Sequence, residues 1–444
     1  MAELSDVDVL IIGAGVLGVN VAYWLSTQFE CTVAIADLAD GAAKHTSSRN
    51  TGVVHRPYYL DPQKKRVFAL TSLVSHPLWE SLANEAGLPW RRAGTVHVAL
   101  EESEVRVLEQ YQKWGVQNGM EESELELMDE RGVRNREPEV RARAGLLSRT
   151  DVSVDFGAFS RHIWSRLAAR TRFLGGHRVV SIARGNESTV VSLVSREGRT
   201  SVACRFLVNA AGGGALPLAQ SLGFAQEYAL LNFRGEYWVV DEPFASKVNT
   251  NIYRPPRFPQ YPFLNPHFVV RADGTRQIGP NAVVVPGPYV YGGFGLSKAA
   301  SFLERPVMPK ARLFANKDFV AMAAGEWRSS VSKRAMCQRV RDFVPGLNSE
   351  MLNRRGVFGV RSSVVDRRGF VPEALIFTDE RSAHIVNFNS PGATGAPAFS
   401  ALVVEGLRRG GVLPRMRDPR DRQKIRGWDY HSVVSRLEMS SRLL

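Results

Sequence analysis

The sequence predicts an α/β fold in which a buried parallel sheet is interleaved with a second, mostly antiparallel sheet. Two observations near the N-terminus predict the parallel sheet. Residues 7–12, VDVLII, form a continuous apolar run, and a glycine-rich segment with a helical pattern follows directly. Parallel strands are buried on both faces and therefore lack the alternation of apolar and polar residues. Segments with strand character and turn-like breaks between residues 223 and 354 predict the antiparallel sheet.

The glycine-rich segment, GAGVLG, has the spacing of a dinucleotide-binding turn. Gly13 permits the tight turn, Gly15 lets the backbone approach a pyrophosphate, and Gly18 allows the next helix to pack closely. The N-terminus of that helix presents its dipole to the phosphates. A second buried strand, TVAIAD, ends in Asp37, whose carboxylate can accept hydrogen bonds from a ribose. This order of elements predicts a dinucleotide site without deciding between NAD and FAD.

Later segments favour FAD. Residues 175–206 have the pattern of a three-stranded antiparallel excursion, for which a plain NAD domain has no need. Residues 204–214 form an apolar strand ending in small residues, where backbone and ligand can come close. Residues 384–407 predict a strand, an SPGAT turn and a helix, whose N-terminus can stabilise negative charge on a reduced flavin. The predicted FAD contacts in these segments are Val180, Ala211, Gly212, Pro391, Gly392, Ala393 and Thr394.

Length and composition indicate an ordinary globular protein. A chain of 444 residues, 44% hydrophobic and 23% charged, is long enough for two domains. No apolar run has the roughly 18 residues that span a bilayer, and the N-terminus is acidic where a secretion signal is basic. We therefore expect a cytoplasmic protein. Cys31, Cys204 and Cys337 lie far apart, which suggests neither a disulfide framework nor a metal site.

The net charge of +13 is unusual for such a composition. A basic protein can bind nucleic acid, an anionic membrane or an anionic substrate, or can simply be well solvated. The two basic clusters, at 131–149 and 415–426, lack the interleaved aromatic residues of a single-strand groove. We therefore expect no nucleic-acid partner.

The motifs resemble those of a known enzyme group. IIGAGVLG, SSRNTGVVH, LVNAAG and SPGAT are similar to the D-amino-acid oxidase superfamily of FAD enzymes. Within it, the segments at 233–238, 251–268, 273–283, 342–347 and 359–369 resemble the L-2-hydroxyglutarate dehydrogenase family. The resemblance implies a Rossmann-like FAD-binding domain with an interleaved, mostly antiparallel substrate domain. It also implies FAD as cofactor and a small anionic carboxylate as substrate.

The chain departs from the family where a substrate pocket is expected. It has HRPYY, with Arg56 and Pro57, in place of the longer HxGxYY, and IYRPP, with Arg254, in place of IYPVP. It also has LNPH in place of LGVH. The resemblance therefore supports the class of reaction more than the identity of the substrate.

The resemblance also implies roles for individual side chains. His55 would face the flavin and take a proton from the substrate, because histidine titrates near neutrality; a core or flavin-positioning role is the alternative. Arg361 would hold a substrate carboxylate, with a surface ion pair as the alternative. The resemblance places the segment Arg49, Asn50, Thr51 and Gly52 along the flavin. Weaker candidates for the substrate site are His267, Tyr253, Arg234 and, for a second acidic group, Arg254.

The sequence thus predicts FAD-dependent oxidation of a small 2-hydroxy acid, with L-2-hydroxyglutarate as the first substrate to test. An amino acid or secondary amine is the alternative substrate, and a flavin-fold protein without turnover is the alternative class. Oxygen or a quinone would accept the electrons. Whether FAD is covalently bound and what oligomer forms stay open.

We predict three parts of the chain. The FAD-binding domain takes residues 1–85, 150–222 and 355–414, and the substrate domain takes 86–149 and 223–354, with helices over 309–345. Residues 415–444 form a basic tail with an amphipathic pattern. In that pattern Trp428, Tyr430, Val433, Leu437 and Leu444 could contact an anionic membrane, making the protein peripheral, or could pack on the body.

Overall fold

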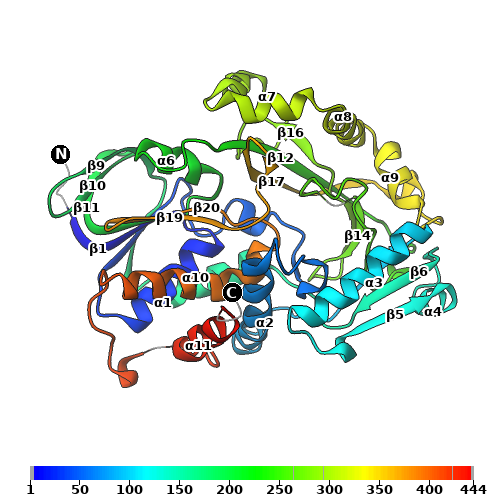
Figure 1. Cartoon of the computed structure of the whole chain (residues 1–444), viewed down its shortest axis with the longest axis horizontal. Helices are drawn as coiled ribbons and strands as arrows, with labels where there is room; N and C mark the ends of the chain where they lie inside the picture. The colour runs from blue at the N-terminus through cyan, green and yellow to red at the C-terminus, as the bar shows by residue number, and fades with distance from the viewer. Residues whose placement is uncertain (1–4, 264, 294, 423, 442–444) are drawn as a thin grey trace.

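The computed structural model describes residues 5–263, 265–293, 295–422 and 424–441. The chain forms two lobes side by side, each built around one large sheet (Figure 1). One sheet has a parallel centre and the other is almost wholly antiparallel. The predicted α/β fold class is confirmed.

The sheet of the first lobe begins with the predicted buried strand. In the described residues its main path has the order β19-β20-β11-β1-β2-β8, in which β11, β1, β2, β8 and β20 pair in parallel. The predicted antiparallel excursion is confirmed as β9, β10 and the first half of β11. The strands are β1 (Ser5–Ile12), β2 (Val33–Ala36), β8 (Thr171–Leu174), β9 (Arg178–Arg184), β10 (Thr189–Ser195), β11 (Gly198–Asn209), β19 (Leu375–Thr378) and β20 (Ser382–Asn387).

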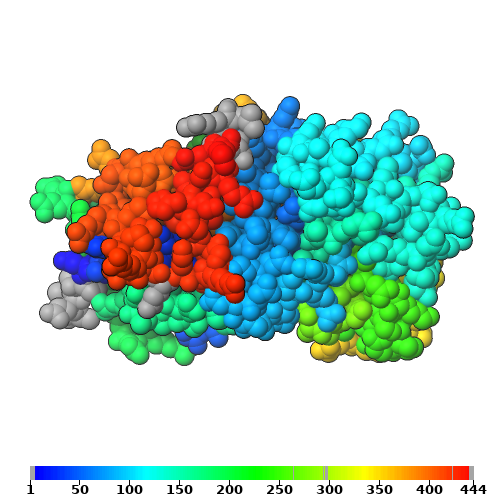
Figure 2. All heavy atoms as spheres, turned by 90° about the horizontal axis from the view of Figure 1, so that it is seen from below, coloured from blue at the N-terminus to red at the C-terminus, as the bar shows by residue number. Residues whose placement is uncertain are grey.

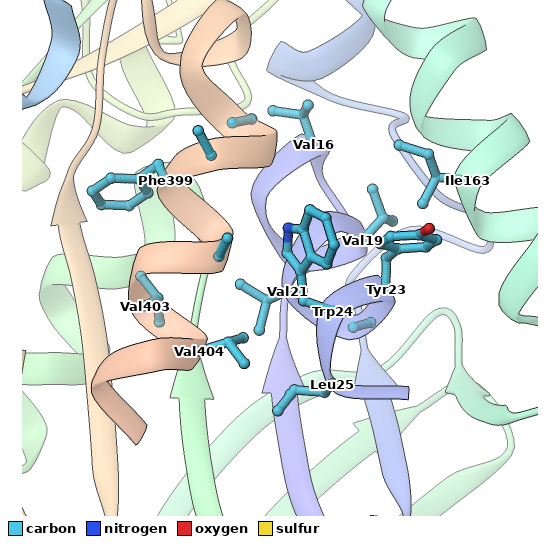
Figure 3. Close-up of a cluster of buried hydrophobic side chains, with 14 of the residues drawn as sticks. Val16, Val19, Val21, Tyr23, Trp24, Leu25, Ile163, Phe399, Val403 and Val404 are labelled. Carbon is cyan, nitrogen blue, oxygen red and sulfur yellow. The ribbon is translucent and has the colours of Figure 1, made fainter. Parts of the chain in front are cut away.

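Two helices far apart in the sequence form the centre of this lobe. Helix α1 (Val16–Gln28) packs between α10 (Gly392–Arg409) and α5 (Phe156–Leu167), as Figure 3 shows. The fully buried indole of Trp24 donates a hydrogen bond of 2.9 Å to the Pro397 carbonyl. Nearly all of α1 is buried, because α10, α5 and the sheet surround it. Helix α2 (Arg66–Ala86) packs against α10.

The second lobe contains the predicted antiparallel sheet, with the order β18-β17-β12-β15-β14-β13-β4-β6-β5 and β16 paired to β12. Only the β13–β4 pair is parallel among the described pairs of this sheet. Its strands are β4 (Thr95–Ala99), β5 (Leu125–Asp129), β6 (Ala144–Ser148), β12 (Ala229–Val239), β13 (Asn251–Tyr253), β14 (His267–Val270), β15 (Arg276–Gly279), β16 (Val283–Val285), β17 (Arg354–Asp366) and β18 (Gly369–Phe370). A two-stranded ladder of β3 (Val53–Val54) and β7 (Val152–Ser153) lies apart from both sheets.

Helices cover the antiparallel sheet on its outer side (Figure 1). The helices predicted over 309–345 are α7 (Val307–Ala315), α8 (Lys317–Val331) and α9 (Lys333–Arg341). Three further α-helices are α3 (Glu102–Gln117), α4 (Glu130–Arg136) and α6 (Ala215–Ser221).

The predicted domain boundary at residue 355 falls at the start of strand β17. It pairs with β12 along most of its length, and β18 continues the same sheet. Residues 354–370 thus belong to the antiparallel sheet by hydrogen bonding. We therefore propose that the FAD-binding domain resumes after β18 and not at 355.

The C-terminal tail packs on the first lobe, which is one of the two alternatives that its sequence left open. Trp428 is fully buried, donates 2.8 Å to the Leu78 carbonyl and lies 5.0 Å from the Tyr23 ring. Val433 and Leu437 of α11 (Tyr430–Ser441) are also buried. Figure 2 shows the orange and red tail lying on the lobe beside blue α2. These apolar residues pack inside the protein and are not exposed to a membrane. Leu444 lies outside the described residues.

The helices in the described part of the chain include none that is long and apolar enough to cross a membrane.

Replacing Trp428 with alanine should lower the free energy of unfolding by about 3–5 kcal/mol, because a large buried indole is lost and the cavity is not refilled. Chemical denaturation followed by far-UV circular dichroism measures this change. Met439→Ala is the matched control, because Met439 lies on the same helix and is 62% exposed. Equal stability of the two variants would show that the tail does not contribute to the core.

Candidate active site

A cavity of about 520 Å³ is lined by residues of both lobes. Residues of the first lobe line one part of it, from the turn after β1, the segment 45–55 and the turn before α10. Side chains of β12, β13, β14 and β17 line the other part. The cavity therefore joins the predicted dinucleotide turn to the predicted substrate residues.

The turn after β1 has the conformation that the glycine pattern requires. Gly13 has a φ of +105°, and a Cβ there would lie 2.5 Å from the Ala210 carbonyl oxygen. Gly15 borders the cavity at the N-terminus of α1, where the Val16 amide donates 2.9 Å to Ser47 Oγ. A Cβ on Gly18 would lie 1.8 Å from the Gly13 carbonyl oxygen. Gly18 is outside the cavity lining and allows the helix to approach the turn.

Asp37 lies at the end of β2 and lines the cavity, as predicted for a ribose contact. Its carboxylate accepts hydrogen bonds from the Ala14 amide at 2.6 Å and from the Ala39 amide at 2.7 Å. These bonds tie the glycine turn to the second strand. Asp37 thus has two roles at the dinucleotide end: it lines the cavity, and it holds the glycine turn in place.

The segment SSRNTG follows the cavity wall. Arg49, Asn50, Thr51 and Gly52 all line the cavity. Thr51 Oγ1 and the Tyr237 hydroxyl are 2.7 Å apart, which connects the segment to β12 of the other lobe. Strand β17 approaches the same segment so closely that a Cβ on Gly359 would lie 1.8 Å from the Arg49 carbonyl oxygen. The motif therefore lies between the two sheets.

Of the other predicted FAD contacts, only one lies away from the cavity. Val180 is half exposed and outside the lining, whereas its neighbour Val179 lines the cavity. Successive side chains of a strand point to opposite faces of the sheet. The prediction was therefore wrong by one residue, and Val180 points away from the cavity. The cavity is lined by the remaining predicted contacts, Ala211, Gly212, Pro391, Gly392, Ala393 and Thr394.

His55 lines the cavity and is held by a buried carboxylate. Its Nδ1 lies 3.0 Å from Asp151 Oδ2, and its backbone amide donates to Thr394 Oγ1 at 3.2 Å. Burial alone would raise the pKa of Asp151, but its hydrogen bond with His55 and others outweigh burial and lower that pKa. An ionised carboxylate only accepts hydrogen bonds, so Nδ1 carries a proton and Nε2 of neutral His55 keeps its lone pair.

Asp151 was not predicted. Besides His55 it accepts hydrogen bonds from the Arg56 amide at 2.9 Å and from the Thr95 and Ser148 hydroxyls, each at 2.8 Å. It lies 96 positions from His55, in a segment, RTDVSVD, without a recognisable motif. No local signal in the sequence could have identified it as the partner of His55.

Arg361 lies on β17 and reaches the cavity beside aromatic rings. Its guanidinium donates to the Pro262 carbonyl and lies 6.0 Å from the centre of the Phe263 ring. Burial lowers the pKa of Arg361. No acidic side chain in the described part of the chain forms an ion pair with it. Arg361 is thus not part of a surface ion pair, which was the alternative prediction. The charge of its guanidinium is available to an anionic ligand.

Tyr253 and His267, the weaker predicted candidates, stack in the same region. Their ring centres are 4.0 Å apart at an interplanar angle of 17°, and both residues line the cavity. Burial lowers the pKa of His267 to about 3, so the ring is neutral. The Tyr253 hydroxyl and His267 Nε2 are buried without a hydrogen-bond partner in the described residues. Buried polar atoms are rarely left unpaired, which suggests that a ligand completes them.

The structure places two other arginines outside the cavity. Arg254, predicted to bind a second acidic group, donates 2.6 Å to Glu104 and lies within 4 Å of Glu101 and Asp342. Arg234 pairs with buried Glu236 at 2.8 Å. Carboxylates of the protein already satisfy both side chains. They do not form part of the site, and the prediction for Arg254 is wrong.

The cavity fits FAD. One end has a glycine turn and a helix N-terminus suited to a pyrophosphate, and the N-terminus of α10 borders the other part beside His55. Gly15 borders the cavity without a side chain, which lets the backbone approach a dinucleotide, and a Cβ at Gly13 or Gly18 would collide with neighbouring backbone. Fold and cavity together define a flavin-dependent oxidoreductase.

Residues 8–405 match the family DAO, described as FAD dependent oxidoreductase. The chain belongs to this family, and FAD is its cofactor. The predicted superfamily is confirmed.

The chain is similar to several curated relatives. It is 24% identical to the mitochondrial L-2-hydroxyglutarate dehydrogenase of Nematostella vectensis over 426 residues, 90% of each chain. It is 26% identical to the L-2-hydroxyglutarate dehydrogenase of Indibacter alkaliphilus, over 90% of this chain and 98% of that one. The human enzyme is 23% identical over 92% of this chain and 90% of its own. Identities at this level do not determine the substrate.

Solved structures share the fold. Dithionite-reduced L-alpha-glycerophosphate oxidase from Mycoplasma pneumoniae with FAD bound has a TM-score of 0.72, at 21% identity over 95% of this chain and 98% of its own. Glycine oxidase from Geobacillus kaustophilus has a TM-score of 0.67, at 16% identity over 91% and 95%.

Gly15→Val should abolish retention of FAD, because a branched side chain would enter the space at the N-terminus of α1. The ratio of flavin to protein absorbance after purification measures the loss. Gly325→Val is the control, because a Cβ at Gly325 has open space around it. A Gly15→Val protein with full flavin content would contradict the assignment of the dinucleotide end.

Proposed function

We propose that the protein oxidises a small 2-hydroxy acid to the 2-oxo acid. The observation that carries this proposal is the placement of two groups on one cavity. His55 has a free lone pair and a carboxylate behind it, and Arg361 has a charge that no described acid neutralises. A base and a fixed cation suit a substrate that has a hydroxyl next to a carboxylate. The names of the curated relatives agree with this chemistry.

FAD, when bound, supplies the two-electron acceptor for the reaction. The protein supplies the base, since Nε2 of His55 can take the hydroxyl proton of the substrate. Asp151 holds the imidazole in the tautomer that this step requires, and it stabilises the imidazolium that forms. The buried Thr394 hydroxyl binds the His55 amide and keeps this residue beside the N-terminus of α10.

Arg361 orients the substrate. Its guanidinium can bind both oxygens of a carboxylate in one plane, which limits rotation of the neighbouring hydroxyl carbon. The Tyr253 hydroxyl and His267 Nε2 lack partners among the described residues and belong to side chains that line the cavity, so they can form hydrogen bonds with this substrate. Because both atoms are buried, a bound ligand would supply the hydrogen-bond partners that they lack.

Anaerobic mixing of the FAD-loaded protein with 2-hydroxy acids and with amino acids tests the proposal. L-2-Hydroxyglutarate is the first compound to use. Loss of the oxidised flavin absorbance with a 2-hydroxy acid is the expected result. Reduction by amino acids alone would establish the amine alternative and exclude the proposed reaction. Reoxidation by oxygen and by a soluble quinone, compared on the reduced protein, identifies the electron acceptor.

His55→Ala should slow flavin reduction about a hundredfold or more, because the general base is lost. Asp151→Asn should also slow it and change its pH profile, because the amide can donate toward Nδ1 and favour the wrong tautomer. Anaerobic stopped-flow absorbance measures both rates. Ser148→Ala is the control, since it removes one donor to Asp151 and leaves the carboxylate. Unchanged reduction in a fully flavin-loaded His55→Ala variant would exclude His55 as the base.

Arg361→Lys should weaken substrate binding about tenfold or more although the charge is kept, because an ammonium group cannot bind a carboxylate through two parallel hydrogen bonds. The substrate dependence of the flavin reduction rate gives this dissociation constant. Arg354→Lys is a control on the same strand, at an exposed position. An unaltered dissociation constant would show that Arg361 is not the anchor.

A further inference from the structure

We infer that the preferred substrate carries one carboxylate and an apolar side chain, and that a second carboxylate weakens binding. This inference rests on the proposed function, because it names the substrate class of the same site. It differs from the substrate in the names of the curated relatives, since 2-hydroxyglutarate has two carboxylates. The reaction converts R–CHOH–COO⁻ to R–CO–COO⁻, with the hydroxyl proton passing to His55 and two electrons with the carbon-bound hydrogen passing to FAD.

The first argument is the distribution of cations along the cavity. Arg361 is the arginine that lines the part formed by β12, β13 and β17. Arg49 also lines the cavity, but its guanidinium lies 4.5 Å from the Tyr291 ring centre, and Tyr291 stacks on His45, which is within the electrostatic reach of Asp37 at the dinucleotide end. Arg178 lies beside His177, whose amide binds the Asp37 carbonyl at the dinucleotide end. Among the described lining residues, Arg361 is therefore the cation at the substrate end of the cavity, and it can pair with one carboxylate.

The second argument concerns the cations near this end of the site. Arg254 is held by Glu104, Glu101 and Asp342 and does not line the cavity. Lys65 is not a lining residue. Burial and then the charge of Arg361 lower the pKa of Lys65, while Glu373 and Asp61 raise it. Ion pairs thus neutralise Arg254. Lys65 is set aside because it does not reach the cavity.

The third argument is the surface next to Arg361. The rings of Phe233 and Phe263 have centres 4.2 Å apart, and Phe233 is the residue opposite Arg361 in the β12–β17 ladder. Tyr59 lines the cavity as well, with its ring centre 5.6 Å from that of His55. A carboxylate placed among such rings loses its hydration without gaining a cation, which is costly. An alkyl or aryl side chain gains by leaving water at the same place.

Binding of unreactive analogues tests the inference without requiring turnover. The FAD-loaded protein is titrated with 4-methylpentanoate, glutarate and the monoamide of glutarate, and the flavin absorbance change gives each dissociation constant. We expect 4-methylpentanoate to bind at least about tenfold more tightly than glutarate, with the uncharged monoamide between them. Equal or tighter binding of glutarate would overturn the inference.

Oxidation of two matched substrates separates this inference from the proposed function. L-2-Hydroxyisocaproate should reduce the flavin with at least about tenfold greater efficiency than L-2-hydroxyglutarate. Faster reduction by L-2-hydroxyglutarate would uphold the proposed function and overturn this inference. If neither compound reduces the flavin while the analogues bind in the expected order, the proposed reaction fails and the single-carboxylate site stands.

A variant with a second cation provides the converse test. Phe263→Lys should reverse the order of affinity between glutarate and 4-methylpentanoate, because the new ammonium group can pair with the second carboxylate. Phe263→Leu is the matched control, which removes the ring without adding charge and should keep the original order. Flavin content and thermal unfolding confirm that both variants are folded. A Phe263→Lys protein that still prefers 4-methylpentanoate to the same degree would contradict the assignment of Phe263 to the surface that receives the side chain of the substrate.

Discussion

The buried carboxylate of Asp151 is the interaction on which the arrangement of the site depends. It accepts hydrogen bonds from His55 Nδ1, the Arg56 amide, Thr95 and Ser148. These groups come from the segment after β3, from β4 and from the end of β6. A fully buried carboxylate without such donors would be strongly destabilising. Its ionisation therefore requires that three separate segments come together at one point. The same point sets the direction of the His55 imidazole.

Arg361 is the electrostatic counterpart of this carboxylate. The protein satisfies Asp151 completely, whereas it provides Arg361 with a backbone carbonyl and an aromatic neighbour but no described acid. The cavity thus presents an internal negative charge that is neutralised and a positive charge that is left for the ligand. Under the proposed function, this asymmetry would let a substrate carboxylate enter without meeting a repelling charge. The neutral His267 ring and the protonated Tyr253 hydroxyl line the same cavity.

Local patterns in the sequence were sufficient to predict the parts of the site that depend on neighbouring residues. Gly13, Gly15 and Asp37 lie where the motif predicts them, and both His55 and Arg361 reach the cavity. Partners distant in the chain were missed, because Asp151 and Gly359 act through contacts made only after both sheets form. Arg254 was wrongly placed in the pocket because its neutralising acids lie far away in the sequence. The sequence could not decide between packing and membrane contact for Trp428, because its partner Leu78 is also distant in the chain.

Strand β17 has a further consequence for how this site can change over evolutionary time. Gly359 lies against the backbone of the cavity-lining segment at Arg49, and Arg361 follows two positions later on the same strand. Under the proposed function, the two-residue spacing of Gly359 and Arg361 along one strand would set the distance between the cofactor and the substrate carboxylate. Phe263, in contrast, lies in the connection between β13 and β14, outside either strand. Substitutions in that connection can alter which side chain a substrate carries, while the reacting carbon stays at the same place relative to the flavin.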